Sequence, residues 1–236
     1  MGKTKIAVMQ PYLFPYIGYF QLIHSVDKFI YLDDVTYIKR GWINRNKILI
    51  QNHPAYFTIP CKKISQNKHI NETEHDLNDS KRQKLLKKLT LAYKNAPYFH
   101  DVIEIFEQVI TSDHTKIGEL AKLSIGQICS YLGLKTLLIK SSTLYGNNNL
   151  YGEDRIIDFC IKEKAHTYIN PMGGQKLYNS QVFDRHGINL NFMMPESLPY
   201  KQFNNDFVPW LSILDVLMFN DPHTVRATLL KAYKLV

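Results

Sequence analysis

The residues best suited to chemistry lie together near the start of the chain. The carboxylates Asp33 and Asp34 are followed by a tryptophan, three cationic side chains and two amides. Arginine offers a planar fork for phosphate or carboxylate, lysine offers a compact charge, and amides can orient hydroxyl groups. This mixture is more typical of a ligand site than of a solvated surface, and one aspartate could act as a base or hold a cation. The residues that follow the aspartates are Lys39, Arg40, Trp42, Asn44, Arg45 and Asn46.

An aromatic loop precedes this stretch. Gln10, Tyr12 and Tyr16 border Pro11 and Pro15, and prolines stiffen a loop because their φ angles are fixed. A stiff aromatic loop can clamp a ring or a sugar. The alternative is that the aromatic side chains only cover the core, as aromatic residues usually do.

Two apolar runs place these residues at the ends of strands. The run 6–9 predicts a strand that ends at Gln10, and the run 28–32 predicts a second strand that ends at Asp33. A helical pattern near 20–23 lies between them, which completes a β-α-β unit. In open parallel sheets ligands bind beyond the carboxyl ends of the strands. We therefore expect the loops that follow both strands to project to one side of the sheet.

A third polar segment follows a later strand. The run 167–169 predicts this strand, and Asn170, Gly173, Gly174 and Tyr178 come directly after it. Paired glycines would let backbone amides approach an anion, and the amide and the phenol would add polar contacts. An ordinary surface turn is the alternative.

These segments predict a single ligand cleft, because loops that follow parallel strands emerge at the same edge of a sheet. Two unrelated surface turns are the competing interpretation. The cleft would combine Gln10, Tyr12, Asp34, Arg40, Asn44 and Arg45 with Asn170, Gly173 and Gly174.

The middle of the chain predicts a hairpin and a helical segment. Strands over 42–51 and 56–60 would be joined by a turn at 52–54. The region 80–132 has a helical pattern, with a break at 95–97 and a stop at Gly133. Strands and helices alternate again after that point.

This order of elements predicts an α/β fold. We expect a mostly parallel, Rossmann-like sheet with a helical insertion over about 79–133 and a small β-hairpin. The length of 236 residues fits a single domain that spans 1–236.

Composition limits the class of protein and its partners. No apolar stretch approaches the ~20 residues of a membrane-spanning helix, and the chain does not open with a secretory signal. We therefore expect a cytoplasmic protein without membrane insertion. The net charge of +8 suits a nucleotide or a phosphorylated sugar, whereas nucleic acid is disfavoured because no nucleic-acid-binding motif accompanies the charge. The histidines and cysteines show no metal-site spacing, so we predict no metal site.

Signature loops of several enzyme classes are missing from the sequence. It contains no Gly-x-Ser-x-Gly elbow, no Gly-x-x-x-x-Gly-Lys-Ser/Thr loop and no Gly-x-Gly-x-x-Gly fingerprint. This argues against a standard serine hydrolase, a P-loop enzyme and a typical dinucleotide dehydrogenase. The first β-loop-α unit faintly resembles a nucleotidylyltransferase, but Gly18 lacks the flanking histidines of the His-x-Gly-His loop in those enzymes.

The chain resembles the WbqC-like family. Residues 9–19 read Met-Gln-Pro-Tyr-x-x-Pro-Tyr-x-Gly-Tyr, and Asp33-Asp34 is followed by Gly-Trp-Ile-Asn-Arg-Asn at 41–46. The segments 168–178 and 211–217 also resemble the family, so the resemblance spans nearly the whole chain.

The resemblance implies a bacterial role in O-antigen, lipopolysaccharide or other surface-polysaccharide biosynthesis. The resemblance does not fix the reaction, but together with the cationic, amide-rich loop it leads to the hypothesis of a transferase that attaches an acyl or aminoacyl group to a nucleotide-linked amino sugar. The partners would be a nucleotide sugar and an activated acyl or aminoacyl donor, and the sequence identifies no cofactor. A non-catalytic nucleotide-sugar-binding protein that assists a neighbouring enzyme is the alternative.

The transferase hypothesis assigns roles to the polar residues. Arg40 and Arg45 would neutralise phosphates, and the two amides at positions 44 and 46 would orient the substrate. Asp34 would accept a proton from the attacking amine, with Asp33 and Lys39 as further candidate catalytic residues.

Overall fold

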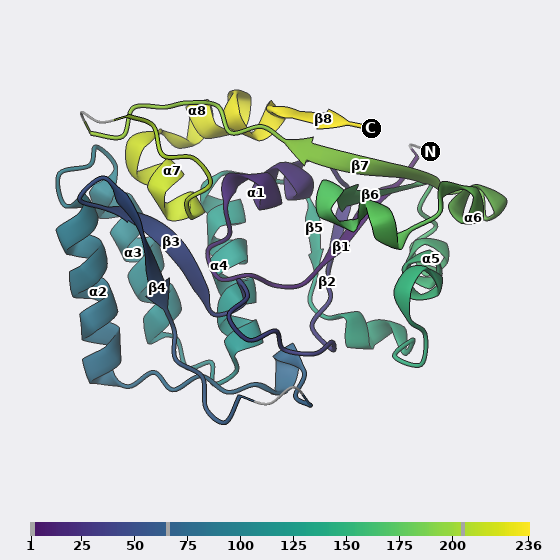
Figure 1. The fold of residues 1–236 in the computed structure, drawn as a ribbon, viewed down its shortest axis with the longest axis horizontal. Coiled ribbons are helices and arrows are strands. Elements are labelled where there is room, and N and C mark those ends of the chain that lie inside the picture. The colour runs from purple at the N-terminus through teal and green to yellow at the C-terminus, as the bar shows by residue number, and fades with distance from the viewer. Residues whose placement is uncertain (1–2, 65–66, 204–205) are drawn as a thin grey trace.

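Six strands form the central sheet of the protein (Figure 1). The structure is a computed structural model that describes residues 3–64, 67–203 and 206–236. The strand order is β5-β2-β1-β6-β7-β8, and all neighbouring pairs are parallel except β7 with β8. The predicted α/β class with a mostly parallel sheet is thereby confirmed. The strands are β1 (Lys5–Met9), β2 (Lys28–Tyr31), β5 (Leu137–Ile139), β6 (Thr167–Pro171), β7 (Asn189–Pro195) and β8 (Tyr233–Leu235).

The direction in which strands are added reverses beside β1. The chain first moves outward from β1 to β2 and β5, and it then crosses back to place β6 and β7 on the other side of β1. This is the strand order of doubly wound nucleotide-binding sheets. The loops that follow β1 and β6 diverge at such a switch point, which leaves a crevice at the carboxyl edge of the sheet.

Side chains from the two faces of the sheet fill two cores. Ala7 and Phe29 pack in the larger core, which includes the apolar faces of α1 (Ile17–His24) and α4 (Ile117–Tyr131). Ile6 and Ile30 point the other way, because successive residues of a strand alternate between faces. They pack against the helices on the second face, which are α5 (Gly152–Lys162) and α6 (Ser180–Arg185).

The predicted hairpin is confirmed, but its turn is displaced from the predicted position. β3 (Arg45–Ile50) and β4 (His53–Thr58) are joined by Gln51 and Asn52, whose φ angles are 48° and 65°. Two left-handed residues match the twist of a hairpin. The turn predicted at 52–54 is wrong, because His53 already pairs with Ile50 in the hairpin. Pro54 is tolerated in β4 because this strand has a free edge.

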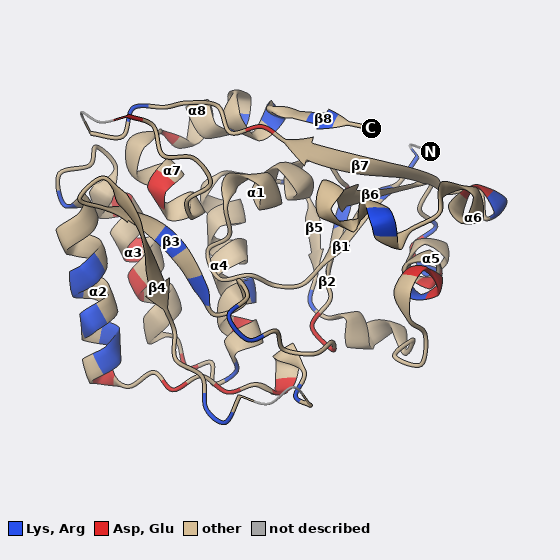
Figure 2. Cartoon of the chain, viewed as in Figure 1, with Lys and Arg blue, Asp and Glu red and all other residues tan. Residues whose placement is uncertain are grey.

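Three α-helices occupy the described part of the chain between the hairpin and β5, namely α2 (Asp79–Tyr93), α3 (Phe99–Thr111) and α4. The helix break predicted at 95–97 lies between α2 and α3, and Gly133 follows α4 with a φ of 63°. Lysines cover the outer face of α2 (Figure 2). The helical insertion is therefore confirmed, whereas its membership of one domain stays a prediction.

The remaining elements are short helices. They are α7 (Ile213–Phe219), α8 (Pro222–Ala227) and the 3₁₀ helices η1 (Ile70–Glu72), η2 (Ser142–Tyr145), η3 (Met172–Leu177) and η4 (Leu229–Lys231). In the described part of the chain, no helix combines the length and the apolar character needed to cross a bilayer.

Candidate functional site

A pocket of about 300 Å³ lies in the crevice between the ends of β1 and β6. We call it the switch-point pocket. Apolar side chains such as Val8, Leu32 and Ile156 contribute to its lining. The pocket brings together predicted site residues from two segments that are far apart in the sequence. These residues are Gln10, Tyr12, Asn170, Gly173, Gly174 and Tyr178.

The two glycines of this pocket have different surroundings. A Cβ atom at Gly174 would lie 2.0 Å from Nδ2 of Asn170, so a side chain there would displace the asparagine. A Cβ atom at Gly173 would meet nothing within 4 Å. Asn170 is itself fixed, because it accepts a hydrogen bond of 3.0 Å from the hydroxyl of Tyr168 and donates one of 3.2 Å to the carbonyl of Pro171. Gly174 thus packs against the pocket wall, whereas Gly173 leaves open space.

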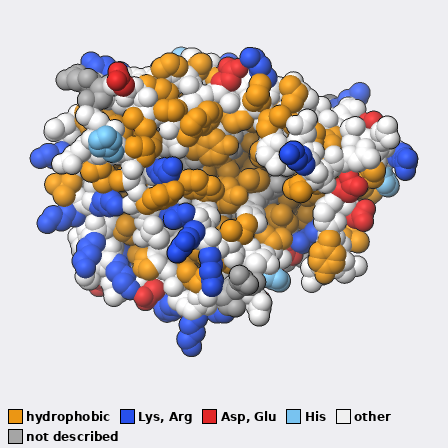
Figure 3. Space-filling model, in the orientation of Figure 1, with side chains coloured by type: hydrophobic (Ala, Val, Ile, Leu, Met, Phe, Trp, Pro, Cys, Tyr) orange, Lys and Arg blue, Asp and Glu red, His pale blue; other side chains and the backbone are white. Residues whose placement is uncertain are grey.

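A second pocket of about 420 Å³ adjoins the first, because Tyr12 lines both. We call it the aromatic pocket. Figure 3 shows a broad hydrophobic surface on this face of the molecule, hollowed near its middle. Exposed aromatic faces can stack on a nucleobase or on the apolar face of a sugar. The lining comprises Tyr12, Pro15, Tyr16, Trp42, Asn46, Pro195 and Trp210.

The loop that carries the tyrosines is held in a strained conformation. Phe14 has a φ of 40°, which is unfavourable for a residue with a side chain. Its N–H donates to Oγ of Ser124 at 3.0 Å, and its carbonyl accepts from Asn46 at 2.8 Å and from Ser212 at 2.7 Å. Phe14 is fully buried, and Tyr12 lines the pockets. The loop therefore contributes both to the core and to the pockets.

The two amides proposed to orient a substrate make hydrogen bonds within the protein. Asn44 donates to the carbonyl of Ile59 at 2.8 Å, and Asn46 donates to the carbonyls of Leu13 and Phe14. Both asparagines are buried, although Asn46 also lines the aromatic pocket. Asn46 therefore attaches the hairpin to the aromatic loop, whereas Asn44 joins the residues before β3 to the residue after β4.

Cationic side chains form a rim beside the aromatic pocket. The guanidinium of Arg45 lies 4.4 Å from the centre of the Tyr56 ring and donates to the carbonyls of Gly41 and Arg40. The ammonium of Lys47 lies 5.9 Å from the Trp42 ring, which lines the pocket. Figure 3 shows Lys and Arg gathered next to the hydrophobic surface.

Several predicted cationic residues stand outside the pockets. Lys39 and Arg40 are exposed, and Arg40 has a φ of 58° in the turn before the hairpin. Neither they nor Arg45 belong to the linings of the switch-point and aromatic pockets. Contact between these cations and a ligand therefore stays a prediction.

The tyrosines of the pockets are hydrogen-bond donors at neutral pH. Burial raises the pKa of Tyr12, and the neighbouring Tyr16 raises it further. Burial also raises the pKa of Tyr16 and of Tyr178. Their hydroxyls stay protonated and can donate to a ligand oxygen.

Asp34 lines a third cavity, of about 660 Å³, beside the ends of β2 and β5. We call it the polar cavity. Its lining consists mainly of amide, carboxylate, imidazole and hydroxyl side chains, which can bind a ligand rich in hydroxyl groups. The lining residues are Asp34, His69, Asn71, Glu72, Thr143, Gly146, Asn147 and Asn148.

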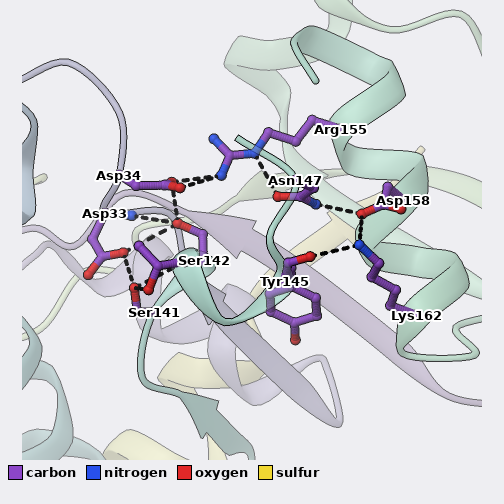
Figure 4. Close-up of polar contacts among 10 residues, drawn as sticks. Asp33, Asp34, Ser141, Ser142, Tyr145, Asn147, Arg155, Asp158 and Lys162 are labelled. Atoms are coloured by element: carbon purple, nitrogen blue, oxygen red, sulfur yellow. Dashed lines mark hydrogen bonds and ion pairs between the residues drawn. The ribbon is translucent and has the colours of Figure 1, made fainter. Parts of the chain in front are cut away.

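Asp34 forms a buried ion pair with Arg155 of α5 (Figure 4). The side chains are 8% and 9% exposed, and one guanidinium nitrogen contacts both carboxylate oxygens at 2.6 and 2.8 Å. The hydroxyl of Ser142 donates to the same carboxylate at 2.5 Å, and Nε of Arg155 donates to Asn147 at 3.0 Å. Asp34 would therefore have to exchange one of these contacts in order to act as a base.

Asp33 joins β2 to the segment after β5. Its carboxylate accepts 2.9 Å and 2.6 Å hydrogen bonds from Lys122 and Ser141, respectively. The residue is 1% exposed. The sequence did not identify Lys122 and Arg155 as site residues, because a lone cation on an amphipathic helix is usually part of the solvated face. Their partners lie about a hundred residues away, and no local signal identifies such pairs.

Within the described ranges, no group of three or more histidine, cysteine, aspartate or glutamate side chains is arranged to hold a metal ion. The fold is a doubly wound α/β fold, and the switch-point pocket lies at the carboxyl edge of its sheet. A family model described as the WbqC-like protein family matches residues 10–227. The chain therefore belongs to the WbqC-like family.

One relative has a similar length. The uncharacterized protein Rv1507c of Mycobacterium tuberculosis is 31% identical over 220 residues, which cover 92% of this chain and 93% of that protein. No solved structure matches the chain significantly.

Proposed function

We propose that this protein is a transferase of bacterial surface-polysaccharide or unusual-sugar biosynthesis. It attaches an acyl or aminoacyl group to a nucleotide-linked amino sugar. The observation that carries the proposal is the pair of adjoining pockets at the switch point, which share Tyr12. Doubly wound sheets bind nucleotides at this position.

The aromatic pocket is the proposed nucleobase site. Its rings offer stacking surfaces, and the basic rim around Arg45 and Lys47 suits the nearby phosphates. In the switch-point pocket, Gln10 and Tyr178 supply polar contacts, and Gly173 leaves space for close approach of the ligand. Arg40 is the further proposed phosphate contact.

The proposed reaction is amide formation. The amine nitrogen of the sugar attacks the carbonyl carbon of the activated donor, so that a carbon–nitrogen bond forms and the bond to the leaving group breaks. The proton lost by the amine goes to a base, for which we propose Asp34, and Arg155 is poised to hold the carboxylate in place. Asp33 and Lys39 are the remaining proposed catalytic residues.

A non-catalytic nucleotide-sugar-binding protein is the second candidate. The observation that favours it is that both Asp33 and Asp34 are already paired with cations, Lys122 and Arg155, whose side chains are only 10% and 9% exposed. Such a protein would bind the nucleotide sugar and release it unchanged to a neighbouring enzyme.

Tryptophan fluorescence tests the proposed binding site. The chain has two tryptophans, Trp42 and Trp210, and both line the aromatic pocket. Titration with UDP- and dTDP-linked amino sugars should quench this emission, and the change should be smaller in Trp42→Phe and Trp210→Phe. A tryptophan amide in solution corrects for light absorbed by the nucleotide. The variant Tyr12→Ala should weaken binding, whereas Tyr151→Ala, at an exposed residue outside the three pockets, should not.

Mass spectrometry then separates the two candidates. Acyl-coenzyme A and aminoacyl donors are supplied together with a nucleotide sugar that quenches the emission. A product heavier by the acyl or aminoacyl group supports the transferase. Binding without product from any donor supports the binding protein, and the absence of any binding contradicts both.

A further inference from the structure

We infer that the polar cavity is the subsite for a sugar ring that carries a free amine. This inference rests on the proposed function, and it specifies which part of the substrate enters which cavity. The volume of about 660 Å³ leaves ample room for a hexose ring.

The polar cavity lies next to the switch-point pocket. Leu32 lines the switch-point pocket and stands two residues before Asp34, which lines the polar cavity. Ile156 also lines the switch-point pocket, and its neighbour Arg155 holds Asp34. The buried ion pair thus stands between the two cavities. The sugar of a molecule that extends from the aromatic pocket through the switch-point pocket would lie beside this pair.

The charges of the lining favour an amine over a phosphate. Among the described residues that line the cavity, two are carboxylates and none is lysine or arginine. The charge of Asp34 is offset by Arg155, but Glu72 has no cation within salt-bridge distance in the described part of the chain. Glu72 is an exposed residue whose carboxylate accepts a 3.0 Å hydrogen bond from the backbone N–H of His69, while its backbone carbonyl accepts one of 3.2 Å from Nζ of Lys116. A carboxylate without an ion-pair partner attracts an ammonium group and repels a phosphate.

The lining also provides hydrogen-bonding groups for hydroxyls. Oδ1 of Asn71 is buried and has no hydrogen-bond partner, although the backbone N–H of Asn71 is bound to the carbonyl of Asp33 at 3.0 Å. An unmatched acceptor on a residue that lines the cavity favours a ligand that donates. Thr143 and Asn148 add groups that can both donate and accept. A polyhydroxylated ring matches this set.

Nitrogen-15 heteronuclear NMR can test the cavity directly, because the chain is 27.6 kDa. The probes are 2-, 3- and 4-aminohexoses, glucose, N-acetylglucosamine and glucose 6-phosphate, each at up to tens of millimolar. At least one aminohexose should shift the backbone amides of Asn71, Gly146 and Asn148. Its dissociation constant should be about tenfold lower than those of glucose and N-acetylglucosamine, because one charge-assisted hydrogen bond strengthens binding by about that factor.

Two variants sharpen this test. Glu72→Gln keeps an acceptor for the backbone N–H of His69 but removes the charge. The dissociation constants of the aminohexose and of glucose should then differ by no more than about twofold. Asn71→Leu should weaken the binding of all the sugars. The control is Glu107→Gln, which removes one exposed carboxylate from α3 and should change nothing.

The outcomes separate this inference from the proposed function. The indole N–H signals of Trp42 and Trp210 report the nucleotide, whereas the amides near Gly146 report the sugar. If nucleotides shift the indoles but no aminohexose shifts the cavity amides, the inference is overturned and the nucleotide site stands. A preference for glucose 6-phosphate, or an equal response to glucose and the aminohexoses, also overturns it.

Discussion

Replacing Gly174 by alanine should destabilise the protein, whereas the same change at Gly173 should not. The new methyl group at position 174 would lie 2.0 Å from Nδ2 of Asn170, so the amide must move away. That movement breaks the hydrogen bond from the hydroxyl of Tyr168, which is fully buried, and the bond to the carbonyl of Pro171. Loss of the buried bond from Tyr168 costs about 1–3 kcal/mol, and the second bond adds about 1 kcal/mol.

The expected loss at Gly174 is therefore about 2–4 kcal/mol of unfolding free energy. At Gly173 a methyl group meets nothing within 4 Å, so the change should stay within about 0.5 kcal/mol. Urea unfolding followed by tryptophan fluorescence measures both values, provided that the slope of the unfolding free energy against urea concentration is the same in each variant.

A double-mutant cycle with Tyr168→Phe checks the mechanism. The phenylalanine removes the hydroxyl whose bond to Asn170 would be broken, so the cost of Gly174→Ala should fall by at least about 1 kcal/mol in that background. Equal stabilities of Gly174→Ala and Gly173→Ala would refute this account of the pocket wall.

Three further substitutions test other contacts. Arg155→Met leaves the carboxylate of Asp34 buried without its cation, so it should lower the free energy of unfolding in urea at neutral pH by about 3–5 kcal/mol. The double variant with Asp34→Asn should recover part of that loss, and no recovery would contradict the pairing. Asn46→Ala removes the donor that holds the aromatic loop, so it should lower the free energy of unfolding by about 1–3 kcal/mol and speed hydrogen exchange of the Phe14 backbone amide. An unchanged exchange rate would count against this role of Asn46. Burial lowers the pKa of His75, so the unfolded chain binds the proton more readily than the folded chain. The stability from this histidine should be fully present above about pH 6.5 and should be lost as the pH falls through its lowered folded pKa, while His75→Asn should show a flatter stability profile in acid unfolding; identical profiles would exclude this contribution.

Patterns along the chain predicted the fold well, because they depend on local residues. The run 28–32 and the alternation after Gly133 indicated parallel strands separated by helices, and the structure confirms that class. The turn of the hairpin was misplaced, because Asn52 and Pro54 are both turn formers. Only the pairing of His53 with Ile50 shows which of them turns the chain.

The site was harder to predict, because its contacts are made between distant segments. The rule that ligands bind at the carboxyl ends of strands predicted that the loops near Gln10 and Gly173 would meet, and both line the switch-point pocket. The cations that pair with Asp33 and Asp34 could not be predicted, since they come from helices about a hundred residues further along. The residue types alone also do not show that the donor group of Asn44 is already used within the protein.

The affinity of Gly173→Ala for a nucleotide sugar tests the central claim most directly. This change adds one methyl group to the open space of the switch-point pocket without touching the protein. A nucleotide-linked amino sugar that quenches Trp42 and Trp210 in the unmodified chain should bind the variant at least about tenfold more weakly, although the variant remains equally stable. An unchanged dissociation constant in a folded Gly173→Ala variant would contradict the placement of the nucleotide sugar in this pocket.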